Sequence, residues 1–343
     1  MQNSLLRIIA YIAVICSVCS CKYTTNTPSV TTKRFTNEVL LAYTPVKDQG
    51  SSSLCWAYAM LATIETEHIQ MGDSVNLSVD YIARHLLGEQ ARCHFLSHGY
   101  DRVTLRGTAP LLLRLLTEYG VMPYDSYHAP GINYNAVAKR IVMLSNSSRN
   151  MSQLERRTER LFDERIGALP RKVYMLGAEY TPEEFAHSVC MRGEYMAMTS
   201  FTHHRFGEAF VLEVPDNYSD ELFYNVPIDV MMKRIERSLR SGHPVCWEGD
   251  TSEVGFDFSR GIAELTKPRP YTQRQRQLEF ENRQTTDDHC MTLVGIAHDN
   301  KGNRYYIAKN SWGTDNPYGG LVYMSEQYVR MKTIAIVVKN INM

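Results

Sequence analysis

The chain has 343 residues, 44% of them apolar, so it can bury the core of one large domain or two small ones. Its 37 lysines and arginines balance its 37 aspartates and glutamates, which gives a formal net charge of zero. This balance excludes a global field that would steer the protein to nucleic acid or to an anionic surface. The densest basic stretch, residues 267–283, interleaves acids with its arginines and is expected to be a solvated loop.

The N-terminus has the pattern of an export signal. Arg7 is followed by an apolar run at residues 8–18, which is too short to span a bilayer but suits a signal-peptide core. The run ends in VCSC at residues 18–21, which resembles a bacterial lipoprotein box with Cys21 as the lipid-bearing residue. The alternative is an ordinary signal peptide cleaved near Ser20 or Cys21. Both interpretations predict export, and the first places the protein in a bacterial cell envelope, with the lipid as its membrane contact.

After this signal segment, residues 1–21, the stretch 22–38 is rich in Thr, Ser, Asn and Pro and is expected to be a flexible tether. Two of the eight cysteines leave with the signal and Cys21 is the candidate anchor, so an odd number remains. At least one thiol is therefore unpaired, or paired with another chain. The remaining cysteines are Cys55, Cys93, Cys190, Cys246 and Cys290.

Metal and cofactor sites are not predicted. The close pairs of cysteines that are typical of zinc sites do not occur. The pair His203-His204 stands in a polar stretch without a recognisable partner. The many tyrosines are expected to line the core and a cleft, because no basic groove accompanies them to make a nucleic-acid platform.

A buried helix is predicted to begin at Cys55. From Trp56 onward, apolar and small residues keep helical spacing, Gly72 is a plausible stop, and the serines at 51–53 are candidate caps. In the first turn of a helix, unpaired backbone N–H groups and the positive end of the dipole stabilise a thiolate, the reactive form of cysteine. Taken alone, however, a cysteine on an apolar helix is more often a small core residue.

The C-terminal third predicts a hairpin that opens on a histidine. Residues 288–296 are an apolar strand candidate, 299–303 a turn, and 304–309 a second strand. In such a hairpin, residues whose numbers sum to roughly 600 lie opposite each other, so His289 is expected beside Asn310. An amide acceptor would fix the tautomer of a neutral histidine and leave its other ring nitrogen to face a thiol. Cysteine, histidine and an orienting residue together make a nucleophile system.

Two motifs carry a family resemblance. DQG at residues 48–50, followed by Cys55 and Trp56, resembles the nucleophile motif of papain-like cysteine peptidases. This resemblance implies that Cys55 is the nucleophile and that Gln49 donates to the oxyanion hole.

The second motif, NSWG at residues 310–313, resembles the asparagine motif of the same family. It implies that His289 is the general base, that Asn310 orients it, and that Trp312 shields their hydrogen bond from water.

Other stretches point to one branch of that family. Residues 111–123 resemble the helix and turn that follow the substrate edge, and residues 222–248 resemble a segment of bleomycin hydrolase and aminopeptidase C. The branch carries a longer C-terminal arm that enters the cleft and makes its members aminopeptidases, whereas here the sequence stops soon after a strand predicted at 333–338. We therefore expect cleavage within chains, with aminopeptidase action as the alternative.

The resemblance also suggests substrate contacts. The glycine pair that usually holds the substrate backbone appears here as Arg106-Gly107, so only Gly107 carries over. Cys290 stands where the family often lines the pocket for the side chain two residues before the cut, beside Glu248 and Asp288.

The implied fold is α+β, with a helical lobe packed on an antiparallel β-rich lobe. Cys55 and His289 would face each other across the cleft between the lobes. The expected boundaries are a peptidase domain at 39–343, divided into a helical lobe at about 53–130, an insertion at about 131–223 that is helical at 151–166, and a β-rich lobe at about 224–343.

The expected function is hydrolysis of peptide bonds in a peptide or protein substrate through an acyl-enzyme on Cys55, without a cofactor. Two alternatives remain. One is a catalytically weak relative that serves as a binding lipoprotein, although such relatives usually lose the cysteine or the histidine. The other is a different Cys-His enzyme such as a cell-wall amidase, which would have no reason to carry Gln49 and the NSWG motif. Side-chain specificity and oligomeric state are not indicated.

Overall fold

The computed structural model describes residues 35–175, 177–267 and 270–340. The predicted signal segment, the candidate anchor Cys21 and most of the predicted tether lie outside these residues. The end of that tether differs from expectation, because residues 35–38 already belong to strand β1 (Phe35–Leu40). Phe35 stacks on Tyr323 with ring centroids 4.2 Å apart, an aromatic contact that holds this strand on the sheet. None of the helices in the described ranges is long and apolar enough to cross a membrane.

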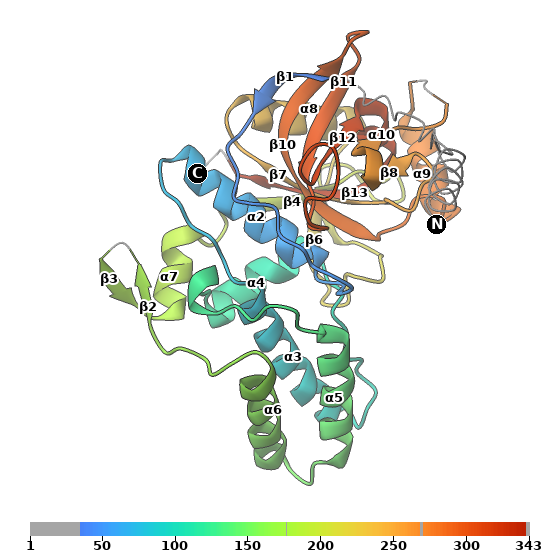
Figure 1. The fold of residues 1–343 in the computed structure, drawn as a ribbon. Helices are drawn as coiled ribbons and strands as arrows, with labels where there is room; N and C mark the ends of the chain where they lie inside the picture. Colours follow the sequence, from blue (N-terminus) through green and yellow to red (C-terminus); the bar gives the residue numbers. More distant parts are fainter. Residues whose placement is uncertain (1–34, 176, 268–269, 341–343) are drawn as a thin grey trace, which may run out of the picture. The chain divides into compact units, whose positions relative to one another are not determined.

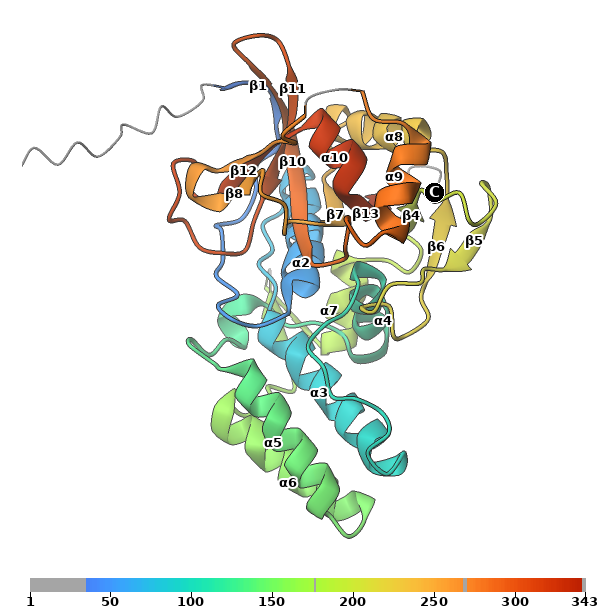
Figure 2. The same cartoon turned by 90° about the vertical axis from the view of Figure 1, so that its right-hand side faces the viewer.

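The first half of the described chain is mainly helical (Figure 1). α2 runs through its middle and packs against β7 and β10 of the sheet described below. α5 and α6 pack on α3 at the end of this helical part that is farthest from the sheet, as Figures 1 and 2 both show. The elements are α2 (Cys55–Gln70), α3 (Val79–Leu96), α4 (Ala109–Tyr119), η1 (Tyr124–Ser126), α5 (Tyr134–Ser147), α6 (Met151–Arg165), β2 (Val173–Met175), β3 (Ala178–Tyr180) and α7 (Pro182–Val189).

The described chain also forms an eleven-stranded sheet, which is mostly antiparallel. The strand order is β5-β6-β4-β13-β7-β10-β11-β12-β9-β8, and β1 pairs with β10. The elements are β4 (Tyr195–Thr199), β5 (Ala209–Val211), β6 (Leu222–Asn225), α8 (Ile228–Arg240), β7 (Val245–Gly249), β8 (Phe256–Asp257), η2 (Phe258–Arg260), β9 (Ile262–Ala263), α9 (Gln273–Glu281), β10 (His289–Asp299), β11 (Arg304–Lys309), β12 (Leu321–Ser325), α10 (Glu326–Lys332) and β13 (Thr333–Lys339).

Strands β7 and β10 are buried on both faces. Successive side chains of a strand point to opposite faces. Accordingly, Cys246 and Cys290 join the core around α2, whereas Trp247 and Met291 join a second core around α8. The central strands therefore lie between two helices and have no face in water. Helices packed on a large, mostly antiparallel sheet are the predicted α+β class.

One predicted boundary is misplaced. The segment at 131–223 was expected to be an insertion, yet β4, β5 and the start of β6 lie inside it and pair within the large sheet. β4 lies antiparallel to β13, with Thr199 opposite Ala335. The β-rich part therefore begins near residue 195, where β4 starts. Without β4, the backbone N–H and C=O groups on one side of the buried strand β13 would lack hydrogen-bond partners.

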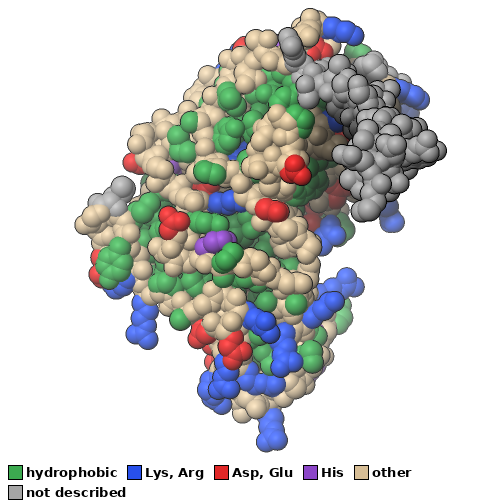
Figure 3. Space-filling model, viewed as in Figure 1, with side chains coloured by type: hydrophobic (Ala, Val, Ile, Leu, Met, Phe, Trp, Pro, Cys, Tyr) green, Lys and Arg blue, Asp and Glu red, His purple; other side chains and the backbone are tan. Residues whose placement is uncertain are grey.

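The surface carries both signs of charge. In the view of Figure 3, lysines and arginines gather over the lower part of the molecule, with acidic groups among them. On α6 in this part, Glu155, Arg156, Glu159 and Arg160 line one shallow surface. This interspersed pattern is typical of a solvated helix face.

Candidate active site

Helix α2 begins at Cys55, as the sequence predicted. The expected serine caps are not found, because the N-cap residue is Leu54 and it makes no side-chain hydrogen bond. Ser52 instead donates its hydroxyl to the Gln49 carbonyl (2.7 Å), which closes the turn before the helix. The positive end of the helix dipole at Cys55 is therefore not neutralised by a side-chain cap, and this favours a thiolate.

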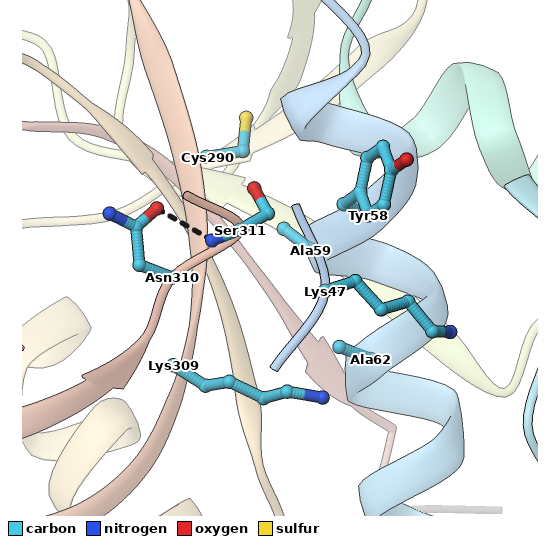
Figure 4. Close-up of a pocket in the computed structure, with 8 residues that line it drawn as sticks. All are labelled: Lys47, Tyr58, Ala59, Ala62, Cys290, Lys309, Asn310 and Ser311. Carbon is cyan, nitrogen blue, oxygen red and sulfur yellow. Dashed lines mark hydrogen bonds between the residues drawn. The ribbon is translucent and has the colours of Figure 1, made fainter. Parts of the chain in front are cut away.

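His289 begins β10, and its Nε2 lies 2.7 Å from Oδ1 of Asn310. The Asn310 oxygen also accepts the Ser311 backbone N–H (2.7 Å; Figure 4), which fixes the orientation of the amide. With Nε2–H donated to Asn310, the other ring nitrogen of His289 is left for Cys55. The ring of Trp312 lies over His289 with centroids 4.5 Å apart, and Phe256 and Phe258 flank this tryptophan.

The hairpin that joins these groups is offset slightly from the predicted register. Thr292 pairs with Lys309, and Ile296 pairs with Tyr306, with a bulge between Leu293 and Gly295. Gly295 is required there, because a Cβ would lie 2.3 Å from the backbone oxygen of Val39 in the paired strand β1. The structure thus places His289 and Asn310 together, while their catalytic roles stay predictions.

The Cys55 thiol has a pKa well below its usual value. The largest cause is a hydrogen bond from the side chain of Cys290; the hydrogen bond and charge of His289 add to it, while burial acts in the opposite direction. The Cys290 thiol in turn has its pKa raised well above the ordinary value, first by its hydrogen bond with Cys55 and then by burial. Cys290 therefore keeps its proton beside the Cys55 thiolate, an influence on the thiol that the sequence analysis missed although Cys290 directly follows His289.

Gln49 connects the segment before α2 to the asparagine segment. Its Nε2 donates to the Ser52 carbonyl (2.7 Å), and its Oε1 accepts the Ser311 hydroxyl (2.7 Å). Its backbone N–H donates to the Ser311 carbonyl (2.8 Å). These bonds hold the amide near the first turn of α2, where its remaining N–H is free to serve a substrate oxygen. Donation of this N–H to a substrate oxygen stays a prediction.

The Peptidase C1-like family model matches residues 171–343, which is half of the chain. The chain belongs to this family. Its fold is papain-like, as the sequence resemblance implied. The solved structure of PepW from Lactobacillus rhamnosis superposes with a TM-score of 0.67 at 16% identity, covering 90% of this chain and 82% of that one.

Two named relatives of this C1-like peptidase come from lactobacilli. Aminopeptidase G of Lactobacillus delbrueckii subsp. lactis is 23% identical over 396 residues, covering 97% of this chain and 89% of that protein. Aminopeptidase E of Lactobacillus helveticus is 26% identical over 180 residues, covering 49% of this chain and 41% of that protein.

Gly107 passes close to α2 in this C1-like peptidase. A Cβ there would lie 2.7 Å from Cδ2 of Leu111 and 2.9 Å from Cε2 of Trp56. The Trp56 indole also donates to the Leu105 carbonyl (2.9 Å) and so anchors the segment. Glycine is therefore required for the close approach, and its contact with substrate stays a prediction.

A group of carboxyls lies beside the nucleophile. Glu248 stands opposite Cys290 in the β7–β10 ladder and is fully buried, and neither of its carboxyl oxygens has a hydrogen-bond partner in the described part of the chain. Burial, reinforced by Asp216 and Cys55, raises the pKa of Glu248 to about 8. Burial likewise raises the pKa of Asp287 well above its usual value, and Oδ2 of Asp287 also has no partner among the described residues.

The sequence analysis named the wrong aspartate for this position. It placed Asp288 beside Glu248, but the Asp288 carboxylate accepts the backbone N–H (2.8 Å) and the hydroxyl (3.1 Å) of Thr251. Asp287 is instead the aspartate next to Glu248, because burial raises the pKa of Asp287 and the charge of Glu248 adds to that effect.

The histidine pair has a partner that the sequence did not reveal. Nε2 of His203 and Nε2 of His204 lie 3.2 and 2.6 Å from the two carboxylate oxygens of Glu213, so these three residues are a candidate metal group. However, Gln277 Oε1 accepts the Thr202 N–H, so its Nε2 must be the group that donates to Nδ1 of His203. A neutral His203 then carries its proton on Nε2 and donates it to Glu213, which explains the cluster as a hydrogen-bonded network.

The five cysteines among the described residues are all free. Behind the site, a cavity of about 10 Å³, room for about one water molecule, lies between α2 and the ends of β10 and β11. Figure 4 shows Lys47 and Lys309 reaching toward α2 along its wall. Both approach Glu65 of α2, at 2.7 and 4.0 Å, and burial lowers the pKa of Lys309 to about 8.

Proposed function

We propose that this chain is an active thiol peptidase that hydrolyses peptide bonds through Cys55. The observation that carries the proposal is the 2.7 Å hydrogen bond from His289 to Asn310, which leaves the second ring nitrogen of His289 for a thiol whose pKa is lowered. Membership of the Peptidase C1-like family supports peptides as substrates.

In the proposed mechanism, the Cys55 thiolate attacks the carbonyl carbon of the scissile bond while His289 holds the thiol proton. The oxyanion that forms is stabilised by the first turn of α2 and by the free N–H of Gln49. His289 gives its proton to the leaving amine, so the C–N bond breaks and an acyl-enzyme remains. His289 then takes a proton from water, whose oxygen attacks the acyl carbon and releases the acid and the thiol.

The alternatives are less well supported. A binding-only relative would have no need for a hydrogen bond between Cys290 and Cys55 that lowers the pKa of the Cys55 thiol. A cell-wall amidase would have no need for the contacts that join Gln49 to Ser311. Neither alternative agrees with the named relatives, which are aminopeptidases.

Aminopeptidase action is the second candidate function. The sequence-based preference for cleavage within chains gains no support from the relatives, since aminopeptidases G and E are both exopeptidases by name. The unpaired carboxyls of Glu248 and Asp287 also favour a site that receives a positive charge. Comparing kcat/KM for peptides with free and with acetylated amino termini separates the two modes of cleavage.

The proposed activity is tested by labelling and turnover together. An epoxide-type thiol inhibitor should modify Cys55 alone among the described cysteines and abolish peptide hydrolysis, because Cys55 is the one held as a thiolate. Mass spectrometry locates the adduct, and Cys55→Ala, which should be inactive, is the control. Labelling of Cys93 or Cys190 with Cys55 untouched, or hydrolysis by Cys55→Ala, would overturn the proposal.

A further inference from the structure

Glu248 and Asp287 are buried carboxyl groups that the catalytic mechanism does not use. Carboxyl oxygens without hydrogen-bond partners are costly in a protein interior, because a buried charge needs a counter-charge and a buried neutral acid needs a hydrogen-bond partner. Among the described residues, both oxygens of Glu248 and Oδ2 of Asp287 lack a partner of good geometry. Burial has the largest effect on the pKa of Glu248 and raises it, while the Asp287 carboxyl and the backbone N–H of Ala109 at the start of α4 act to lower it.

The position of the pair relates it to substrate. Glu248 is the cross-strand neighbour of Cys290, which hydrogen-bonds the Cys55 thiol. Side chains of such a cross-strand pair stand on the same face of a sheet, about 5 Å apart. Glu248 therefore lies one side chain away from Cys55, on the same face of the sheet as Cys290.

We propose that Glu248 and Asp287 form a subsite that binds a positively charged group of the peptide substrate, either its terminal ammonium or a lysine or arginine side chain. The inference rests on the proposed peptidase function and adds a substrate class to it. In the empty site the two carboxyls share a proton. A substrate cation takes the place of that proton and supplies both the counter-charge and the hydrogen-bond donors that the pair lacks.

Other charged groups face the pair from several elements, and most of them carry negative charge. On the acidic side, burial raises the pKa of Asp216, and the negative charges of Asp216 and Cys55 raise those of Glu248 and Asp287. On the basic side, Arg106 lowers the pKa of Asp287. The groups that face Glu248 are Cys55 of α2, Cys246 of β7, Cys290 of β10, Asp287 before β10, Asp216 before β6 and Arg106 before α4.

Arg106 is a nearby cation that does not pair with these carboxyls. Its side chain is half exposed, and it donates to the Asp216 carboxylate and to the Asp287 backbone carbonyl, but to neither carboxyl of the Glu248–Asp287 pair. The counter-charge that the pair lacks must therefore come from another group.

The pH dependence of binding is a signature of this arrangement. The pKa of Glu248 in the empty site is about 8, chiefly because burial disfavours its charge, so the pair holds a proton at neutral pH. Binding of a cation then releases a proton. Affinity for a permanently charged ligand should consequently rise about tenfold for each pH unit up to about pH 8 and then level off.

The test uses the Cys55→Ser protein and four short peptides in a two-by-two design. The first residue is lysine or its uncharged counterpart norleucine, and the amino terminus is free or acetylated. At pH 7, calorimetry should show tighter binding, on the order of tenfold or more, when the peptide carries a lysine side chain, a free amino terminus or both. The reference is the acetylated norleucine peptide, which carries neither positive charge. The norleucine peptide with a free terminus reports the terminal ammonium, and the acetylated lysine peptide reports the side chain.

Glu248→Gln should remove most of that advantage, whereas Asp315→Asn, which deletes an exposed charge in the loop after Asn310, should leave it unchanged. If Glu248→Gln fails to fold, the protein that retains Glu248 still tests the subsite. Calorimetry in two buffers of different ionisation enthalpy measures whether it releases a proton when a cationic peptide binds. Equal affinity for all four peptides, or binding of the cationic peptides without proton release, would overturn the subsite. Hydrolysis by the wild-type protein tests the peptidase function separately.

Discussion

The side chain beside the nucleophile is a second thiol, that of Cys290. It follows His289 at the start of β10, and the side chains of both residues act on the Cys55 thiol. His289 also meets Asn310. A protonated thiol that donates to a thiolate stabilises the charged form, and this interaction is the largest of the causes that lower the pKa of Cys55.

Replacing Cys290 by alanine should therefore raise the pKa of the Cys55 thiol. The rate of alkylation by iodoacetamide follows the thiolate fraction, so the midpoint of its pH profile should move upward and alkylation at pH 6 should slow. Cys93→Ala, at an exposed cysteine of α3, is the control and should leave the midpoint in place. A midpoint that stays or falls in Cys290→Ala would show that His289 and the helix dipole account for the low pKa alone.

Among the secondary-structure elements, α2 is joined to two distant segments through one carboxylate. Glu65 accepts from the Thr44 hydroxyl, from Nζ of Lys47 (2.7 Å) and from the Leu77 backbone N–H (2.7 Å). Nζ of Lys309 in β11 lies 4.0 Å away. Because β11 leads into Asn310, this buried ion cluster fixes the helix that begins at Cys55 against the strand that leads to Asn310.

Replacing Glu65 by leucine should leave two ammonium groups without a carboxylate, one of them deeply buried. Removing one member of a buried ion cluster typically costs about 3–5 kcal/mol in the free energy of unfolding. Urea unfolding followed by circular dichroism measures this loss. The matched control is Glu118→Gln, which breaks a partly exposed pair with Arg114 and should change the free energy by no more than about 1 kcal/mol. A loss below that size at Glu65 would mean that water replaces the carboxylate.

For the whole molecule, the sequence predicted those features of the fold that depend on local residue patterns. The start of α2 and the β10–β11 hairpin follow from helical spacing and from a turn signal, and the hairpin alone brings His289 to Asn310. The place of Asp216 near this site could not be predicted in the same way. Asp216 is joined to Arg106 from 110 residues away, and no local pattern records that contact.

The boundary of the β-rich part was misplaced for the same reason. β4, β5 and β6 have only three to five residues each, too few for a clear alternation. β4 pairs with β13, which is more than a hundred residues further along the chain, and β6 and β5 join the sheet through β4. Such pairings between distant segments form only in the tertiary structure, so a local sequence pattern does not predict them.

The predicted lipid anchor also concerns the whole molecule. If Cys21 carries the several acyl chains of a lipoprotein cysteine, the protein should fractionate with membranes, because multiple chains anchor far more firmly than one. Cys21→Ser should move it to the soluble fraction, and Cys19→Ser is the matched control that should not. Membrane association of Cys21→Ser equal to that of the wild type would refute the anchor.

The bulge in β10 makes the active site sensitive to insertions and deletions. Val294 is the one residue of this strand that has no partner between Leu293 and Gly295 in the β10–β11 ladder. Deleting it would shift everything upstream by one position, and a shift of one residue turns each side chain to the opposite face of a strand. The contacts of His289 with Asn310 and with Cys55 would then be lost, although all three residues would still be encoded. Residues 300–303 lie beyond the bulge and outside the strand pairs of β10, so this turn is where the chain should gain or lose residues without disturbing those contacts.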